Sequence, residues 1–314
     1  MNDIHEASEK FHAVLYADDT SLIEPLCTFN DSSQTDQVDQ DALSDGINSE
    51  LQSIYDWLCV NKLSLNIPKT KFMMFRHKQR RIGNLMPNLR INGNAIDYVS
   101  AFNFLGVMLD ENLTFDHHIQ NISNRISRSL GTLNKLKRFV PQNILLLLYN
   151  SLILPHLQYA ILCWGSKTSR LFKLQKRAMR IITCSKYNAH TDPIFKKLRI
   201  LKLNDIYNQC LLKFYYKFKQ KTLPTYFHDI LSSHSHSYLT RGRNNPVHTH
   251  TNTSSAKFSV RNCLPRFLDG APSLMTDKVD THSFQGFSRY CKNYYINTYS
   301  DQCSVANCYI CSKS

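Results

Sequence analysis

An Asp-Asp pair near the N-terminus has residue types and spacing that suit metal chemistry. Asp18 and Asp19 lie between two short apolar segments, in the tetrapeptide Tyr16-Ala17-Asp18-Asp19. This pattern predicts a β-hairpin whose turn presents two carboxylates. Mg²⁺ prefers carboxylate oxygens, and a tight turn brings two of them close enough to bind or flank a metal pair about 4 Å apart. The turn is therefore a candidate wall of a two-metal phosphoryl-transfer site, and a solvated surface turn is the alternative.

Two further groups of possible metal ligands lie in the C-terminal third of the sequence. They are Cys303, Cys308 and Cys311 with Cys291 or His282, and the alternating histidines His234, His236, His248 and His250. Structural zinc sites usually contain two well-spaced ligand pairs, whereas this tail has one Cys-x-x-Cys. We therefore favour free or redox-sensitive thiols over zinc, and polar loop chemistry over a metal site for the histidines.

Positive charge is concentrated away from the Asp-Asp pair. Residues 1–60 contain one cation, Lys10, and thirteen carboxylates, although the whole chain has a net charge of +14. Between residues 120 and 221, 20 Lys and Arg stand against two carboxylates, Asp192 and Asp205. A single cation is most often a solvated residue on a helix face, but an excess of this size favours a polyanionic partner such as nucleic acid.

The elements predicted around the Asp-Asp pair form an α+β region. Apolar residues recur with spacings of 4, 4, 3 and 4 from Leu43 to Leu58, which predicts an amphipathic helix with an acidic outer face. Short apolar and aromatic segments at residues 63–75 and 98–109, with Asn92-Gly93 as a turn, predict strands and a second hairpin that complete a small sheet.

Beyond residue 114 the apolar pattern becomes helical. Residues 115–133 carry an apolar stripe with cations mostly off it, which predicts a basic amphipathic helix. Pro141 and Pro155 stand where new helices can begin, and further helices are predicted over residues 171–181 and 203–219. After residue 224 the periodicity weakens. There we expect long loops with one later helix around residues 282–295.

Length and composition favour a globular intracellular protein. With 314 residues and 42% hydrophobic residues the chain can bury a sizeable core. The N-terminus lacks the pattern of a signal peptide, and the most apolar run, residues 144–154, is shorter than the roughly 20 residues that cross a bilayer. Single cysteines in apolar stretches, such as Cys59, Cys163 and Cys210, suit buried thiols in a reducing compartment. We therefore expect a cytoplasmic or nuclear protein without a membrane segment.

A series of short motifs follows one order along the chain. They are Asn2-Asp3-Ile4, Ala17-Asp18-Asp19-Thr20-Ser21-Leu22, Tyr55-Asp56-Trp57-Leu58, Asn61-Lys62-Leu63-Ser64-Leu65-Asn66, Lys69-Thr70-Lys71, Met74-Phe75, Phe104-Leu105-Gly106-Val107, Leu109-Asp110, Leu113-Thr114-Phe115, His118-Ile119, Leu148-Tyr149, Ser151-Leu152-Ile153, Pro155-His156-Leu157, Tyr159, Trp164-Gly165, Leu174-Gln175-Lys176-Arg177-Ala178 and Arg180-Ile181-Ile182. From residue 2 to about residue 220 the chain resembles the reverse transcriptases of non-LTR retrotransposons, of the LINE type and the Jockey and CR1-like group.

The resemblance implies an RNA-directed DNA polymerase with Mg²⁺ as its cofactor. Its expected regions are a partial palm with the YADD hairpin (1–112), a basic helical thumb (113–222) and a loop-rich C-terminal region (223–314). Asp18 would be the Mg²⁺ ligand, with Asp19 as a weaker ligand beside it. Tyr16 and Ala17 would lie near the primer end.

The remaining site residues implied by the resemblance would bind nucleotide and nucleic acid. Lys69 or Lys71 would hold the incoming triphosphate or protonate the leaving pyrophosphate, although each is also readable as a solvated cation at a strand end. Phe104, Leu105 and Gly106 would belong to the primer grip. The cations expected to contact an RNA template and DNA primer, or their hybrid, are Arg125, Arg128, Lys135, Lys137, Arg138, Lys173, Lys176, Arg177 and Arg180.

Catalysis by this chain alone is not expected. In the family the metal pair also requires an aspartate on an earlier palm strand, which would lie upstream of Met1, so the metal site would be incomplete. The alternative hypothesis is a non-catalytic nucleic-acid-binding helical module from a decayed element. A third is an interaction protein with no nucleic-acid partner.

Overall fold

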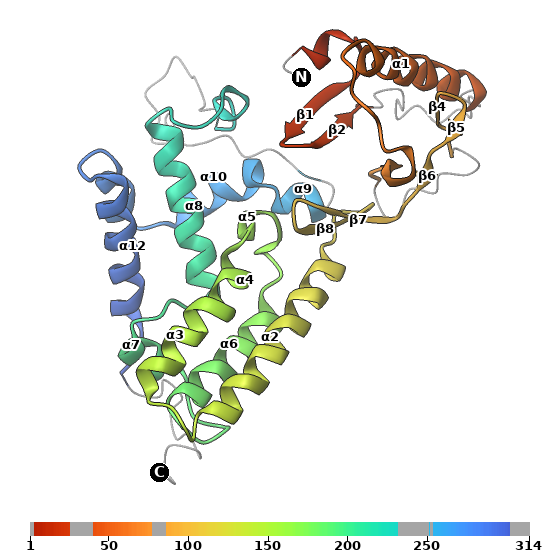
Figure 1. Ribbon diagram of the computed structural model, residues 1–314. Helices are drawn as coiled ribbons and strands as arrows, with labels where there is room; N and C mark the ends of the chain where they lie inside the picture. The colour runs from red at the N-terminus through yellow and green to blue at the C-terminus, as the bar shows by residue number, and fades with distance from the viewer. Residues whose placement is uncertain (1–2, 26–39, 77–85, 232–250, 252–253, 302–314) are drawn as a thin grey trace, which may run out of the picture. The chain divides into compact units, whose positions relative to one another are not determined.

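The computed structural model describes residues 3–25, 40–76, 86–231, 251 and 254–301 (Figure 1). The chain divides into two compact units, one comprising Met1–Asn103 with Asp110–Asn112 and the other Phe104–Leu109 with Leu113–Ser314. We call the first the strand-containing unit and the second the helical unit.

The strand-containing unit consists of short strands, two 3₁₀ turns and one long helix. Its elements are η1 (Ile4–Glu6), β1 (His12–Tyr16), β2 (Asp19–Ile23), α1 (Gln40–Val60), η2 (Ile67–Lys69), β3 (Lys71–Phe72), β4 (Arg90–Ile91), β5 (Asn94–Ala95) and β6 (Asp97–Tyr98). The chain passes between the two units through the hairpin of β7 (Ala101–Phe104) and β8 (Val107–Asp110). The mixed α and β composition agrees with the predicted fold class.

The prediction of one small sheet was wrong for the residues that the structure describes. These strands form four separate pairs, β1–β2, β3–β6, β4–β5 and β7–β8, of which β3–β6 is parallel. The strands β3, β4, β5 and β6 contain only two residues each, and a turn follows β4 at once. This turn is Asn92-Gly93, where both residues have positive φ (48° and 74°), as the predicted hairpin turn requires.

Helix α1 provides half of the buried apolar residues in the described part of the strand-containing unit. Its predicted apolar stripe is buried at Ile47, Leu51, Ile54 and Leu58, which confirms the helical spacing over these positions. Asn48, on the same helix, donates to the Asn88 carbonyl at 3.0 Å and accepts from the Arg90 amide at 2.8 Å. These two bonds fix β4 against α1.

The helical unit contains the remaining helices. They are α2 (Asp116–Leu136), α3 (Gln142–Leu152), α4 (Leu154–Gln158), α5 (Ile161–Trp164), α6 (Ser169–Ile182), α7 (Asp192–Leu198), α8 (Leu203–Lys219), α9 (Ser254–Phe258), α10 (Val260–Gly270), α11 (Ser273–Thr276) and α12 (Phe284–Thr298), with the 3₁₀ turns η3 (Thr225–Phe227) and η4 (Asp277–Val279). Pro141 and Pro155 stand at helix starts, as predicted. Sequence reasoning missed α7, α9, α10 and α11. Helix α10 contains Pro265, a residue that normally argues against a helix interior.

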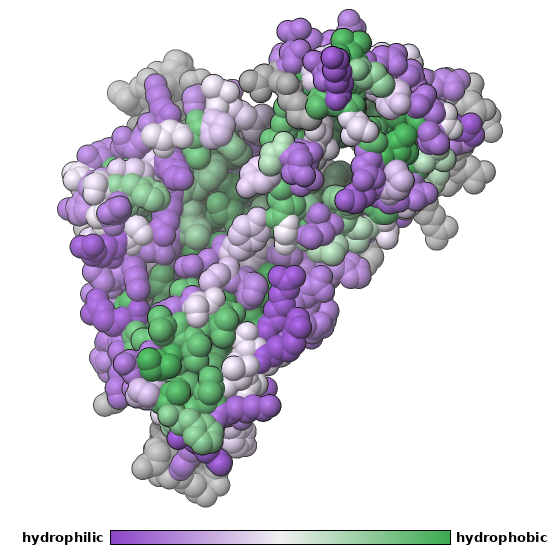
Figure 2. All heavy atoms as spheres, viewed as in Figure 1, coloured by the Kyte–Doolittle hydropathy of each residue, from purple (hydrophilic) through white to green (hydrophobic). Residues whose placement is uncertain are grey.

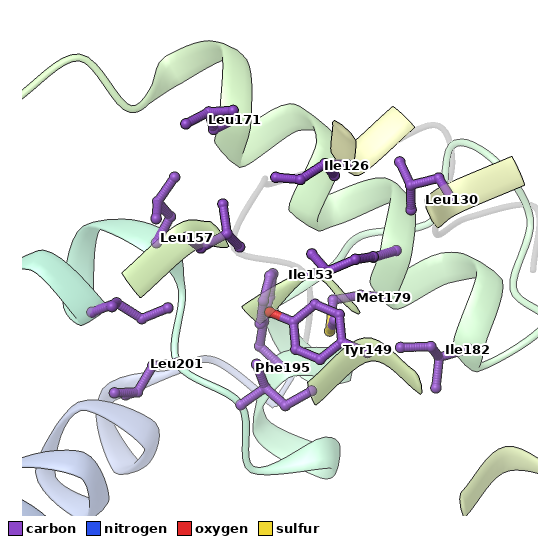
Figure 3. Close-up of a cluster of buried hydrophobic side chains, with 14 of the residues drawn as sticks. Ile126, Leu130, Tyr149, Ile153, Leu157, Leu171, Met179, Ile182, Phe195 and Leu201 are labelled. Atoms are coloured by element: carbon purple, nitrogen blue, oxygen red, sulfur yellow. The ribbon is translucent and has the colours of Figure 1, made fainter. Parts of the chain in front are cut away.

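One large apolar cluster holds helices α2 to α8 together (Figure 3). Ile126 and Leu130 of α2 lie opposite Leu171 and Met179 of α6, and all four are almost completely buried. Each such side chain contributes roughly 1.5–3 kcal/mol relative to exposure. Helix α12 packs on α8 beside a second cluster that includes Phe287. The helical unit therefore has a core of its own.

A buried glutamine links three parts of that core. The Gln175 amide group donates to the Tyr149 hydroxyl at 3.0 Å and to the Leu201 carbonyl at 2.9 Å, and its oxygen accepts from the Leu203 amide at 2.9 Å. Leu203 is the first residue of α8, so the last bond satisfies one of the free amides at that helix start. Burial raises the pKa of Tyr149 to about 12, so this hydroxyl stays protonated.

Cysteine burial and the absence of a membrane-spanning segment were both predicted from the sequence. Cys59 and Cys163 are exposed, against the expectation of buried thiols, because each lies on a helix beside a buried apolar neighbour that faces the core in its place. Among the described helices, none is both long enough and apolar enough to span a membrane. Cys303, Cys308, Cys311 and the alternating histidines lie outside the described residues.

Candidate active site and nucleic-acid interface

The predicted Asp-Asp hairpin is formed by β1 and β2. Tyr16 pairs with Asp19 across a two-residue turn, Ala17-Asp18. Only the first turn residue has a positive φ, Ala17 at 53°, which is the sign pattern of a type II′ turn. The left-handed region costs a residue with a Cβ about 1–2 kcal/mol. The hairpin therefore holds its carboxylates on a locally strained backbone.

Both carboxylates of the turn are available to solvent. Asp18 and Asp19 are exposed, and neither has an ion pair or side-chain hydrogen bond with any described residue. Tyr16, beside them, is 64% exposed although it is aromatic. Paired, exposed carboxylate oxygens have the donor chemistry that Mg²⁺ prefers. Within the described part of the chain, no group of three or more His, Cys, Asp or Glu side chains gathers in a metal-binding arrangement.

The two candidate lysines differ in their surroundings. Lys69 is exposed at the end of η2, and its amide is capped by the Asn66 side chain at 3.3 Å. The Lys71 ammonium group lies 2.5 Å from an Asp97 carboxylate oxygen on the neighbouring strand. Lys71 is therefore engaged in a surface ion pair, and Lys69 is the better candidate for an incoming phosphate.

The residues predicted for a primer grip form the turn of the β7–β8 hairpin. Leu105 and Gly106 both have positive φ, 45° and 81°. The Tyr159 hydroxyl donates to the Leu105 carbonyl at 2.5 Å, and a Cβ on Gly106 would lie 3.5 Å from the Tyr159 ring. Phe104, which precedes the turn, is partly buried. This turn is held by a side chain of the helical unit.

Most predicted nucleic-acid-binding cations lie on two adjacent helices, α2 and α6. These helices pack against each other, and Lys167 forms an ion pair with Asp116 at 3.0 Å between the residues that open them. Figure 2 shows hydrophilic residues over α2 and, beside them, an apolar area over α3. The exposed cations of the prediction are Arg125, Arg128, Lys135, Arg138, Lys173 and Arg177. We call this set the basic face, and exposed Arg170 is a further cation beside it that sequence reasoning missed.

The remaining predicted cations are partly buried. Arg180 donates from Nε to the Ala189 carbonyl at 2.8 Å, and burial lowers the pKa of its guanidinium. Lys176 lies with its Nζ 4.4 Å from the centre of the Phe172 ring. Lys137 is half-buried at the end of α2. These side chains therefore have structural contacts in addition to their charge.

Sequence reasoning also missed the roles of two side chains that hold the hairpin turn. Tyr159 and His118 belong to the motifs of the resemblance, but nothing in their local pattern indicated a contact with residues 104–109. Such a contact links positions 54 residues apart in the case of Tyr159 and Leu105, so only the folded chain reveals it.

The structure thus presents an exposed carboxylate turn in one unit and exposed cations on two helices of the other. Comparison with known proteins finds relatives among the RNA-directed DNA polymerases of mobile elements. The chain is similar to the RNA-directed DNA polymerase from mobile element jockey of Drosophila melanogaster, with 27% identity over 201 residues, which are 60% of this chain and 20% of that protein.

Two further relatives carry related names. The jockey RNA-directed DNA polymerase of Drosophila funebris is 24% identical over 207 residues, covering 63% of this chain and 20% of that protein. A probable RNA-directed DNA polymerase from transposon X-element of Drosophila melanogaster is 24% identical over 195 residues, covering 59% and 21%. The chain is therefore homologous to polymerases of non-LTR mobile elements and spans about a fifth of the length of these relatives. No family model and no solved structure matches it.

Proposed function

We propose that this chain is part of an RNA-directed DNA polymerase of a mobile element, in which it contributes to adding deoxynucleotides to a primer by two-metal phosphoryl transfer. The observation that carries the proposal is the homology to jockey-type polymerases together with an exposed Tyr-Ala-Asp-Asp turn. In this assignment the strand-containing unit corresponds to part of a palm and helices α2 to α8 to a thumb.

Asp18 would be the principal Mg²⁺ ligand, with Asp19 as the weaker one. Both are exposed and have no partner among the described residues, so their carboxylate oxygens are accessible to a hard cation. Bound Mg²⁺ would stabilise negative charge on the attacking and leaving oxygens. Tyr16, with 64% of its surface exposed, would lie beside the primer end. Lys69 would neutralise the triphosphate of the incoming nucleotide, since Lys71 is paired with Asp97.

The basic face would hold the RNA template and DNA primer. Its cations lie on α2 and α6, apart from Arg138, which follows α2, and exposed cations that neutralise phosphates release counterions. Phosphate contacts of this kind position a duplex without reading its sequence. The face would therefore bind a hybrid largely independently of base sequence, as a polymerase that moves along its template requires.

Primer extension on an RNA template with Mg²⁺ tests the proposal. We would compare the wild-type chain with Asp18→Ala and with Asp45→Ala, which removes an exposed carboxylate on α1 of the same unit. Extension that Asp18→Ala abolishes and Asp45→Ala preserves would support polymerisation. Extension by none of these chains would agree with the incomplete metal site, and Mg²⁺-dependent hybrid binding that Asp18→Ala weakens would then support the proposal. Salt-sensitive hybrid binding that neither Mg²⁺ nor Asp18→Ala changes would instead indicate a non-catalytic nucleic-acid-binding module. No detectable binding at low salt would contradict both assignments.

A further inference from the structure

The turn of the β7–β8 hairpin has an unusual backbone for its sequence. Leu105 has φ 45°, a left-handed conformation that bulky L residues rarely adopt, and Gly106 follows at 81°. Such conformations persist when the surrounding structure determines them. Residues Phe104–Leu109, here called the hairpin tip, belong to the helical unit. The contacts that determine the turn therefore come from the helical unit.

Tyr159 supplies the first of these contacts. Its hydroxyl donates to the carbonyl of Leu105 at 2.5 Å, and its ring lies beside Gly106. Tyr159 is 55% exposed, so filling the core does not explain its position. Its own backbone is fixed, because the buried Trp164 indole donates to the Tyr159 carbonyl at 3.0 Å. The bond thus connects the strained turn to a rigid part of the helical unit.

His118 supplies the second contact from α2. Its Nδ1 accepts a hydrogen bond from the Met108 amide at 3.2 Å, so the ring proton of the neutral imidazole is on Nε2. His118 is only 5% exposed, and its Nε2 is buried without a hydrogen-bond partner among the described residues. A buried donor without a partner destabilises the folded state. The Met108 hydrogen bond and the packing of the ring must therefore offset that cost. The edge-on contact of the ring with Trp164, at 5.9 Å between ring centres, orients it.

We propose that Tyr159 and His118 are positioning residues that hold the hairpin tip at a fixed place relative to the basic face. His118 lies on α2 together with Arg125 and Arg128, so one helix connects the tip to the nucleic-acid-binding cations. Gly106 is exposed and has no side chain, which lets a strand approach its backbone closely. The inference rests on the proposed function, in which the hairpin tip belongs to the primer grip that the resemblance implies, and it adds the two side chains that hold the tip.

Hydrogen exchange at the tip tests the anchoring without nucleic acid. Tyr159→Phe removes only the hydroxyl, and His118→Leu removes the acceptor of the Met108 amide. Both should accelerate exchange of the tip amides by roughly five- to tenfold, the factor expected for one lost hydrogen bond. His118→Asn, whose side-chain oxygen can take the place of Nδ1, should restore protection at Met108. Tyr187→Phe is the matched control, since Tyr187 is 90% exposed. Unchanged tip exchange in folded Tyr159→Phe would overturn the anchoring, even if His118→Leu failed to fold.

Cross-linking from the primer end tests the positioning. An RNA–DNA hybrid with a photoreactive group at the primer 3′ terminus should cross-link to residues 104–109 of the wild-type chain. Tyr159→Phe should reduce these cross-links several-fold while hybrid affinity and thermal stability stay near wild type. A parallel loss of affinity and cross-linking would show a merely structural role. If the wild-type chain bound no hybrid, the proposed function would fail, and hydrogen exchange would still decide whether the tip is anchored.

Discussion

Two hairpin turns of this protein share a backbone conformation, a residue with positive φ, and differ in the residues that surround them. Each places a non-glycine residue in the left-handed region, Ala17 at 53° in one and Leu105 at 45° in the other. The first turn is exposed and its two carboxylates have no described partner. The second turn is fixed by Tyr159. One turn thus exposes carboxylate oxygens, whereas the other is held in place by a side chain of the helical unit.

The difference follows from the cores behind the turns. A two-stranded hairpin is marginally stable by itself, and β1–β2 leaves Val14 and Ile23 45% and 52% exposed. The β7–β8 turn instead meets Trp164, which is 1% exposed, through the backbone of Tyr159. We infer that a weakly supported hairpin suffices to present carboxylates, whereas the proposed positioning of a primer would require the rigid support that the helical unit gives.

The largest expected effect separates the two units. Trp164→Ala should lower the unfolding free energy of the helical unit by about 3–5 kcal/mol, because it empties a buried aromatic site. The chain has two tryptophans, so Trp57 of α1 remains and its emission reports the strand-containing unit. Denaturant unfolding should shift the circular dichroism of the helices to a lower midpoint and leave the Trp57 midpoint in place. A joint shift would show that the units unfold together.

A smaller loss is expected from Gln175→Leu. The substitution leaves the Leu201 carbonyl and the Leu203 amide without their partner, which costs about 1–3 kcal/mol for buried groups. Urea unfolding followed by Trp164 emission, in a Trp57→Phe background, measures it. Gln158→Leu makes the same change at an exposed site on α4 and should be close to neutral. Equal effects of the two substitutions would refute a special role for Gln175.

A gain in stability is expected at the Asp-Asp turn. Ala17→Gly should stabilise the strand-containing unit by up to about 1 kcal/mol, because glycine adopts a positive φ without strain. Ala13→Gly, in the extended backbone of β1, should instead destabilise it by roughly 0.5–1 kcal/mol. Thermal unfolding followed by Trp57 emission distinguishes the two signs. Destabilisation by Ala17→Gly would mean that the turn is not strained.

The smallest expected effect is a pH dependence at the anchored hairpin. Burial, and then the charge of Arg125, lower the pKa of His118 below its ordinary value of 6.5, and the pKa of His156 is lowered for the same reasons. In the pH range between the two pKa values, His118 is therefore protonated in the unfolded chain and neutral in the folded chain. Stability should be full above pH 6.5 and fall as the pH drops toward the folded pKa. His118→Asn should flatten this slope in unfolding experiments at pH 7.5 and 5.5, and an unchanged slope would exclude His118 as a source.

Periodic features were predictable from the sequence, and long-range contacts were not. The stripe from Ile47 to Leu58 and the helix starts at Pro141 and Pro155 follow from local spacing and backbone restrictions. The α10 helix was missed because Pro265 lies inside it. A single sheet was predicted because alternation identifies strands without identifying their partners, as the parallel β3–β6 pair illustrates.

In the candidate site, too, positions set by the local sequence were predictable, and contacts between distant residues were not. Asp18 and Asp19 were predictable because adjacent residues in a hairpin turn need no distant partner. The pairing of Lys71 with Asp97 was not, since it joins positions 26 residues apart. The hydrogen bond from Arg180 to the Ala189 carbonyl was not predictable either, because the sequence shows the charge of Arg180 and does not show its burial.

The central claim is that the basic face binds an RNA–DNA hybrid, and the salt dependence of binding tests it most directly. The measurement compares the wild-type chain with the triple variant Arg128→Glu, Lys173→Glu and Arg177→Glu. Its control reverses three exposed cations elsewhere in the helical unit, Lys197, Arg261 and Lys292. We predict that the logarithm of affinity falls linearly with the logarithm of salt concentration, with a slope reduced by about two to three in the triple variant and nearly unchanged in the control. Undetectable binding at low salt, or equal losses in both variants, would contradict the claim.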